Sequence, residues 1–248
     1  ACYISGCRIS NNKIHHNMGT GEGCGDGGNG IHLYAGSEKY EGNVITKNEL
    51  YENRKGGFFT KMKLHYAEIT YNKLYRNGQG GIILRCKKSN YNLIENNDAS
   101  ENFGDGIFIG GEQNTIKNNT VKNNKAGLKI SSTDVVGDGD GINMGRSGEA
   151  NGNELYENIV CGNEGIDVNV APDCSGNHGD GNTCTATNGY DDEGATGCTH
   201  TCGGEAPSDR TEEPVEPEKP SGCGGIGGEG VLIMALLVFL AVRGRGKE

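Results

Sequence analysis

The stretch Asn92–Asn124 decides the fold, because an Asn recurs in it every five residues. It reads N-L-I-E-N-N-D-A-S-E-N from Asn92 to Asn102 and N-T-I-K-N-N-T-V-K-N-N from Asn114 to Asn124. Both segments follow the template Asn-x-φ-x-x-Asn-x-φ-x-x-Asn, in which φ is a small or medium apolar residue. This step matches neither the 3.6-residue period of a helix nor a long strand alternation, so it predicts short strands joined by corners.

The same template recurs along the chain in both directions. It fits residues 43–53 and 153–163, and it fits 67–77 and 7–17 with Ala67 and Cys7 in place of the first Asn. Successive units that end at Asn53, Asn77, Asn102 and Asn124 are 24, 25 and 22 residues apart. Repeats of this length indicate a stacked array, and at least six turns can be counted.

Stacking such turns places equivalent residues in columns about 4.8 Å apart. We expect the apolar columns to fill the interior and the Asn columns to pass amide hydrogen bonds from turn to turn at the corners, where Asn tolerates a left-handed backbone. The sequence therefore predicts a parallel β-helix, and the handedness of parallel crossovers makes it right-handed.

On these repeats the chain resembles the right-handed β-helix repeat family, which includes the pectate-lyase-like and the NosD-like periplasmic proteins. The resemblance covers roughly Cys2 to Val168 and implies an all-β, right-handed parallel β-helix. It implies little about function, because the family contains lyases, epimerases, hydrolases, adhesins and non-enzymatic spacers.

Changes in composition divide the chain into four parts. The β-helix is expected at 1–168, a small Cys-rich cap at 169–202, a Pro- and Glu-rich linker at 203–222 and a hydrophobic tail at 223–248. The segment Cys161–Cys202, which includes the cap, is poor in apolar residues, so we expect disulfides to hold it, although its five Cys cannot all pair with one another. A metal site that uses His178 and His200 lacks the usual Cys spacing. The chain starts in the middle of a turn, which suggests that upstream turns or a cap are missing.

Charge and cysteine content narrow the range of partners and of cellular compartments. A formal charge of −10 with dispersed Lys and Arg argues against a nucleic-acid partner. Ten Cys suggest an oxidising compartment.

The tail has the order of a sorting signal. Cys223-Gly224 precedes the apolar run 231–242, and Arg243, Arg245 and Lys247 follow it. This order is similar to the myxobacterial C-terminal sorting signal, MYXO-CTERM. The resemblance implies export and anchoring by the C-terminus at the cell surface or outer membrane of a Gram-negative bacterium, with processing at Cys223-Gly224.

Strands of the form Gly-φ-x-φ follow the Asn units, and their x residues must face outward if φ faces inward. The predicted outward column is His32, Phe59, Ile83, Phe108 and Lys129, with Tyr34, Lys61 and Arg85 two residues further along. Large apolar residues exposed in a line would form an interaction surface, and the alternative is that loops such as Lys61–Tyr66 cover them.

A break in the repeat separates Asn124 from Asn163. The inserted loop carries Asp134, Asp138 and Asp140, and its Asp-Gly-Asp-Gly segment suggests either a calcium site or a solvated acidic loop. No other cofactor is indicated.

Two functions follow from these features. The first is a surface scaffold or adhesin that binds an acidic polysaccharide or another cell-envelope glycan, with Phe59, Ile83, Phe108 and Tyr34 as contact residues. The alternative is a polysaccharide lyase or C5-epimerase acting on uronate glycans, with Lys61, Arg85, Lys129 and His32 as candidate catalytic residues.

Overall fold

The computed structural model describes residues 5–19, 27–33, 39–61, 63–128, 137–145 and 150–203. The chain divides into two compact units, Ala1–Ala206 and Pro207–Glu248. All described residues belong to the first unit, and the second lies outside them.

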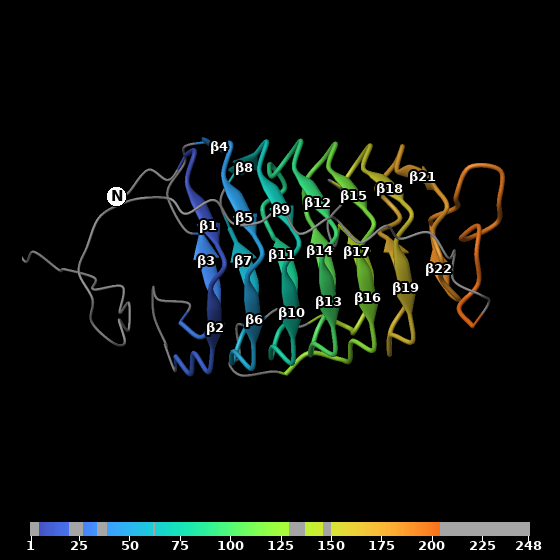
Figure 1. Cartoon of the computed structure of the whole chain (residues 1–248). Helices are drawn as coiled ribbons and strands as arrows, with labels where there is room; N and C mark the ends of the chain where they lie inside the picture. Colours follow the sequence, from blue (N-terminus) through green and yellow to red (C-terminus); the bar gives the residue numbers. More distant parts are fainter. Residues whose placement is uncertain are drawn as a thin grey trace, which may run out of the picture. The chain divides into compact units, whose positions relative to one another are not determined.

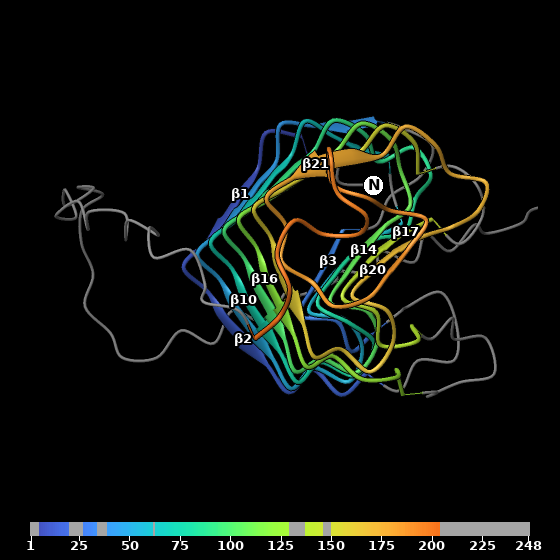
Figure 2. The same cartoon turned by 90° about the vertical axis from the view of Figure 1, so that its right-hand side faces the viewer.

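The first unit is a coil of short parallel strands (Figures 1 and 2). Its buried apolar side chains form one core. Three long parallel sheets run along the coil, and each turn contributes one strand to each sheet, except that the turn of β21 and β22 adds none to sheet B. Sheet A contains β1 (Arg8–Ser10), β5 (Val44–Thr46), β9 (Glu68–Thr70), β12 (Leu93–Glu95), β15 (Thr115–Lys117), β18 (Glu154–Tyr156) and β21 (His178–Asp180). Sheet B contains β2 (Lys13–His15), β6 (Glu49–Tyr51), β10 (Lys73–Tyr75), β13 (Asp98–Ser100), β16 (Thr120–Lys122) and β19 (Ile159–Cys161). Sheet C contains β3 (Ile31–Leu33), β7 (Phe58–Thr60), β11 (Ile82–Leu84), β14 (Ile107–Ile109), β17 (Ile142–Met144), β20 (Val168–Val170) and β22 (Thr187–Asn188). A separate parallel pair joins β4 (Lys39–Glu41) and β8 (Lys63–His65).

The register aligns the repeat columns as predicted. Ile45 pairs with Ile69, and Ile69 pairs with Ile94, each at the middle position of a three-residue strand. Their side chains are fully buried, as are the central residues Leu50 and Leu74 of sheet B. Burying such side chains stabilises the coil by roughly 1.5–3 kcal/mol each, so the columns account for the core.

Three Asn ladders run along the corners, which confirms the predicted hydrogen-bonded columns. In the middle ladder, Asn48 donates from its backbone N–H and from Nδ2 to Oδ1 of Asn72, both at 3.0 Å. Nδ2 of Asn72 also donates to the carbonyl of Ile45, one turn back, at 2.9 Å. The pattern recurs in all three ladders, whose members are Asn43, Asn92, Asn114, Asn153, Asn177, then Asn12, Asn48, Asn72, Asn97, Asn119, Asn158, Asn182, then Asn17, Asn53, Asn77, Asn102, Asn124, Asn163.

The left-handed backbone at the corners lies one residue earlier than expected. Lys47, Tyr71 and Asn96, each directly before a ladder Asn, have φ values of 56°, 55° and 55°. Asn was expected at these positions, and the structure places many residue types there. The side chain at the left-handed position points into solvent, so many residue types fit there. The next residue is the ladder Asn, which turns its amide into the core and forms the ladder hydrogen bonds.

The repeat continues past the predicted boundary at residue 168. β21 pairs with β18 through Leu155 and Gly179, and Asn177 and Asn182 extend two ladders. Gly179 occupies an apolar position of the template, which hid this turn. A Cβ there would clash first with the backbone carbonyl of Leu155 on the neighbouring strand and would also lie 2.6 Å from the hydroxyl of Tyr190, so this position requires glycine.

Segment 189–203 closes this end of the coil. Asp192 takes the place of the next ladder Asn, because it accepts hydrogen bonds from the backbone N–H of Asn182 at 2.9 Å and from its Nδ2 at 2.6 Å. Disulfides join Cys161 to Cys202 and Cys184 to Cys198, as the Cys content suggested. Cys174 remains a free thiol.

Among the described residues, no helix is long and apolar enough to cross a membrane. The predicted linker and tail lie outside these residues.

Candidate functional site

The predicted outward column runs along sheet C and is partly confirmed. His32, Phe59, Ile83 and Phe108 are neighbours in register on β3, β7, β11 and β14. The His32 and Phe59 rings meet edge to face with centroids 5.1 Å apart, and Nζ of Lys61 lies 5.6 Å from the centre of the Phe59 ring. The first four residues of the predicted column therefore follow one another along sheet C, and Lys61 lies beside Phe59.

This column does not offer open aromatic faces. The Phe59 side chain is only 9% exposed, and Ile83 and Phe108 are half-buried. Arg85 is exposed at the end of its strand. The alternative in which these residues are covered thus describes Phe59 better than the predicted line of exposed rings.

The place after Phe108 in the column belongs to Asn143, and the prediction of Lys129 there is wrong. β17 pairs with β14, so the second Gly-φ-x-φ segment, not the first, supplies the strand of this turn. Asn143 is buried and donates from Nδ2 to Oδ2 of Asp140 at 2.8 Å and to Oδ2 of Asp105 at 3.2 Å. These bonds explain why Asn143 and not a lysine occupies this position, since a lysine side chain would leave both carboxylates without this amide donor.

Asp140, proposed as a calcium ligand, is part of the scaffold. It is 2% exposed, and its carboxylate accepts hydrogen bonds from the Ile166 N–H at 2.8 Å and from Asn169 Nδ2 at 2.7 Å, in addition to Asn143. Asp138 is exposed on the same loop. No group of three or more His, Cys, Asp or Glu side chains that could hold a metal ion occurs within the described part of the chain.

Five candidate residues lie outside the described residues. They are Tyr34, Lys129, Asp134, Cys223 and Gly224.

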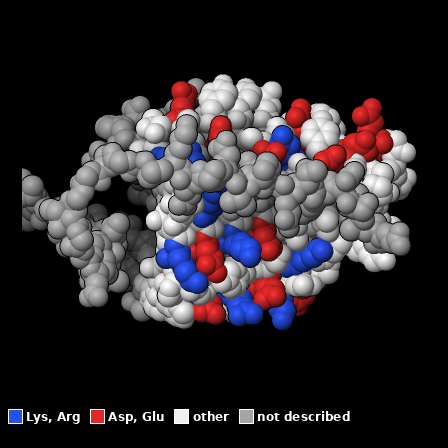
Figure 3. Space-filling model, in the orientation of Figure 1, with Lys and Arg blue, Asp and Glu red and all other residues white. Residues whose placement is uncertain are grey.

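A second surface, which the sequence analysis did not single out, is the outer face of sheet B over the first three turns. The His15 ring stacks on Tyr51 with centroids 4.6 Å apart, and Tyr51 stacks on Tyr75 at 5.0 Å with ring planes 2° apart. Lys13, Glu49 and Lys73 form the neighbouring column on the same strands. Figure 3 shows Lys and Arg intermixed with Asp and Glu over the lower part of this side, where β2, β6 and β10 lie in Figure 1.

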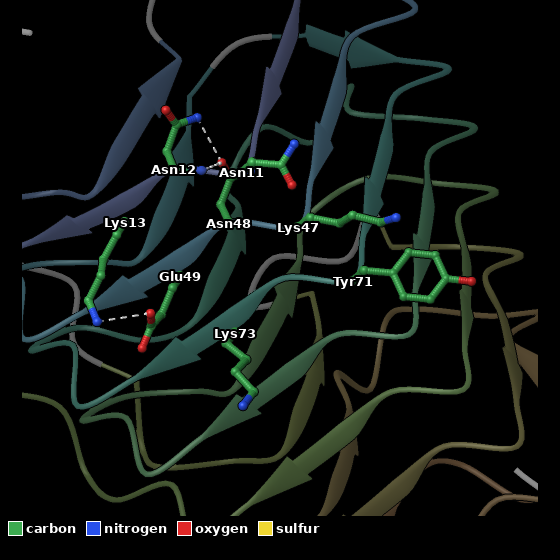
Figure 4. Close-up of a pocket in the computed structure, with 8 residues that line it drawn as sticks. All are labelled: Asn11, Asn12, Lys13, Lys47, Asn48, Glu49, Tyr71 and Lys73. Atoms are coloured by element: carbon green, nitrogen blue, oxygen red, sulfur yellow. Dashed lines mark hydrogen bonds and ion pairs between the residues drawn. The ribbon is translucent and has the colours of Figure 1, made fainter. Parts of the chain in front are cut away.

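An open depression of about 490 Å³ lies beside this aromatic stack, at the corner between sheets A and B (Figure 4). It is lined by Asn11, Asn12, Lys13, Lys47, Asn48, Glu49, Tyr71 and Lys73. Lys47 extends beside the Tyr71 ring, with Nζ 6.0 Å from the ring centre. The Tyr71 side chain is 40% exposed, so the depression has one accessible aromatic wall.

The depression is basic. Lys13 pairs with Glu49 at 3.2 Å, and this contact raises the pKa of Lys13. The pKa of Glu49 is lowered, first by the hydrogen bond from the Tyr75 hydroxyl at 2.6 Å and then by Lys13. The same bond raises the pKa of Tyr75 to about 12. Among the described residues Lys47 and Lys73 form no ion pair, so two ammonium charges remain for a ligand.

A signal for this surface was present in the sequence. Tyr51 and Tyr75 share one position of the repeat, and Lys13 and Lys73 share another. Column alignment of the residues that flank φ would have revealed both. The depression itself depends on the corner side chains Lys47 and Tyr71, whose directions follow only from the left-handed backbone there.

Comparison with known proteins supports the architecture. The family described as "Right handed beta helix region" matches residues 3–188. Among solved structures, the A-module of the mannuronan C-5 epimerase AlgE4 from Azotobacter vinelandii superposes with a TM-score of 0.52 at 17% identity, covering 78% of this chain and 51% of that one. The Dettilon tailspike protein gives a TM-score of 0.47 at 17% identity, covering 80% of this chain and 38% of that one.

The likeness to the epimerase module concerns the fold alone, and the chain spans about half the length of that module. No curated protein matches the chain in sequence. The family match covers most of the chain and agrees with seven stacked parallel strands in each of two sheets. The protein is therefore a member of the right-handed β-helix family.

Proposed function

We propose that this protein is a glycan-binding β-helix of the cell surface, and that it holds an acidic polysaccharide without cleaving it. The proposal rests on one observation above others, the basic depression beside Tyr71. The formal charge of the depression is +2, because three lysines (Lys13, Lys47 and Lys73) and one glutamate (Glu49) line it, whereas the formal charge of the whole chain is −10.

The chemistry of the depression suits such a ligand. An exposed Tyr ring packs against the apolar face of a sugar, and ammonium groups pair with carboxylates. The ladder amides Asn12 and Asn48 lie at the edge of the depression. Nδ2 of Asn12 donates to Oδ1 of Asn48, and Nδ2 of Asn48 donates to the carbonyl of Ile9. A rigid wall of this kind favours binding because the protein loses little conformational freedom.

The setting supports a polysaccharide as the ligand. The turns repeat along the coil, so a chain of sugars can lie across several of them. The epimerase whose module shares this fold is named for mannuronan, an acidic polysaccharide. Surface anchoring through the C-terminal tail is part of the proposal and rests on the sequence of residues 223–248 alone.

The test compares two lysine pairs. Lys47→Ala with Lys73→Ala removes two charges from the depression, and we expect the affinity for a polyuronate to fall about tenfold, because each exposed pair contributes less than roughly 1 kcal/mol. Lys122→Ala with Lys125→Ala removes the same charge two turns away and is expected to leave affinity unchanged. Titration calorimetry at two salt concentrations gives both affinities and their dependence on salt.

A second variant tests the aromatic wall. Tyr71→Asn fits the corner, because Asn11, Asn96 and Asn118 occupy the equivalent left-handed positions. We expect it to weaken binding while leaving the melting temperature close to that of the wild type. Equal affinity in all variants would place the ligand elsewhere, and unsaturated or C5-inverted uronate products would replace this proposal by the lyase or epimerase alternative.

A further inference from the structure

Two adjacent imidazoles converge at the end of β2. Nδ1 of His15 and Nδ1 of His16 are 2.7 Å apart, and the ring planes are inclined by 80°. Adjacent residues of an extended strand point to opposite faces, so this meeting depends on the corner, where His16 has φ = 55°. Both side chains are exposed.

Both rings are held in place by contacts on the side away from their Nδ1 atoms or on the ring face. The His15 ring stacks on Tyr51, with planes 17° apart. Nε2 of His16 lies 3.1 Å from Oε2 of Glu52, and Glu52 in turn approaches Nη1 of Arg76 at 3.9 Å. When Glu52 accepts the Nε2–H of neutral His16, the lone pair of His16 is on Nδ1 and faces His15. A carboxylate behind an imidazole orients metal-binding histidines in the same way.

We propose that His15 and His16 bind a divalent transition-metal ion through their Nδ1 atoms, and that the site favours copper(II) or nickel(II). With metal–nitrogen bonds of about 2.0 Å, nitrogens 2.7 Å apart subtend roughly 85° at the metal. This is close to the right angle of square-planar and tetragonal sites. A tetrahedral zinc ion would require the two nitrogens to lie about 3.3 Å apart.

The site forms by a proton shift and a rotation of the two rings. In the metal-free protein one Nδ1–H donates to the other Nδ1, and binding requires that His15 carry its proton on Nε2 and that both rings turn until their Nδ1 lone pairs meet at the ion. Water completes the coordination, since the described part of the chain brings no third His, Cys, Asp or Glu to this point. The bound ion would lie at the end of the His15–Tyr51–Tyr75 stack. This site is independent of the glycan-binding proposal.

The experiment is a copper(II) titration of the full chain, followed by tyrosine fluorescence and by electron paramagnetic resonance. The chain has no Trp, so emission comes from tyrosine, and copper beside Tyr51 quenches it. We expect one tight equivalent with hyperfine coupling to two nitrogens. His15→Ala and His16→Ala are each expected to lower the affinity at least tenfold. Glu52→Gln should lower it by about 10–100-fold, the range found when an outer partner of a ligating histidine is lost.

His178→Ala is the matched control. His178 is also an exposed histidine close to a glutamate, with Nε2 3.9 Å from Oε1 of Glu154, but within the described part of the chain no second imidazole ring stacks against it. Its loss is expected to leave copper binding unchanged. Cys7, an exposed free thiol, is blocked with iodoacetamide in a parallel series. The proposal would be overturned if copper binding survived in both His15→Ala and His16→Ala, or if it disappeared when Cys7 is blocked. An equal loss of copper affinity in His178→Ala would also overturn it, as would zinc binding as tight as copper binding.

Discussion

At the scale of single residues, the amide of a ladder Asn joins its own turn to the turns before and after it. Asn97 accepts at Oδ1 from the N–H of Asn72 at 2.9 Å and from its Nδ2 at 3.0 Å. It donates from Nδ2 to the carbonyl of Ile69 at 2.7 Å and to Oδ1 of Asn119 at 3.1 Å. Among the side chains of similar size, only an amide supplies two donors and a doubly accepting oxygen in this shape.

Asn97→Leu is therefore expected to lower the free energy of unfolding by about 3 kcal/mol. Several buried polar groups lose their partners, each worth roughly 1–3 kcal/mol, and the burial of leucine offsets part of the loss. Urea unfolding measures the change. Lys117→Ala serves as the control, because its ion pair with Glu95 is at the surface and contributes less than about 1 kcal/mol. Equal destabilisation in the two variants would mean that the ladder amide is not buried.

At the scale of elements, the closing segment 189–203 solves the problem of the open end. A stacked coil leaves the last Asn of each ladder without a next amide, and the carboxylate of Asp192 takes that place for Asn182 in the middle ladder. Besides Asn182, it accepts from the Tyr190 hydroxyl at 2.7 Å and from the Thr199 N–H at 2.8 Å. Burial alone would raise the pKa of Asp192, but these hydrogen bonds outweigh it and hold the pKa below its usual value.

The lowered pKa gives a pH dependence of known sign. The ionised form contributes stability that is fully present above the unfolded pKa, about 3.9, and is lost as the pH falls through the lower pKa of the folded state. Asp192→Asn is expected to destabilise the protein by about 2 kcal/mol at pH 7, since an amide places donors against the N–H groups of the ladder. The difference from the wild type should shrink below about pH 4.

Urea unfolding at both pH values checks this prediction. Asp191→Asn makes the same chemical change one residue earlier, at an exposed side chain that accepts from the Gly197 N–H, and an Asn oxygen keeps that bond. It is expected to show little change at either pH. A gap between Asp192→Asn and the wild type that stays constant with pH would rule out an ionised cap.

At the scale of the whole molecule, the sequence joins the coil to a tether and a tail. The sequence order of Cys223-Gly224, an apolar run and terminal Arg residues predicts that the mature protein lacks residues 231–248 and is held at the cell surface through Cys223. Cys223→Ala is expected to leave the chain unprocessed. Intact mass of the surface-extracted protein checks this, and a wild-type mass that still includes Arg243–Glu248 would contradict it.

The coil, the ladders and the register all follow from the repeat pattern of the sequence. A five-residue step fits neither a helix nor a long strand, so short strands joined by corners remain. Each Asn marks a corner because the pattern is local and repeats along the chain. It also indicated that disulfides hold the closing segment. The template missed the turn of β21, because Gly179 stands at an apolar position where a side chain would meet the carbonyl of Leu155 and the hydroxyl of Tyr190.

Only the tertiary structure decided which surfaces are accessible and which side chains meet. The outward column of sheet C was read correctly as far as Phe108, but local pattern could not choose between two Gly-φ-x-φ segments, and Asn143 took the place of Lys129 because its amide pairs with Asp105 and Asp140. Burial of Phe59 likewise depends on neighbouring turns. The basic depression combines Lys13, Lys47 and Tyr71 from three turns, and residues so far apart in sequence become neighbours only when the turns stack.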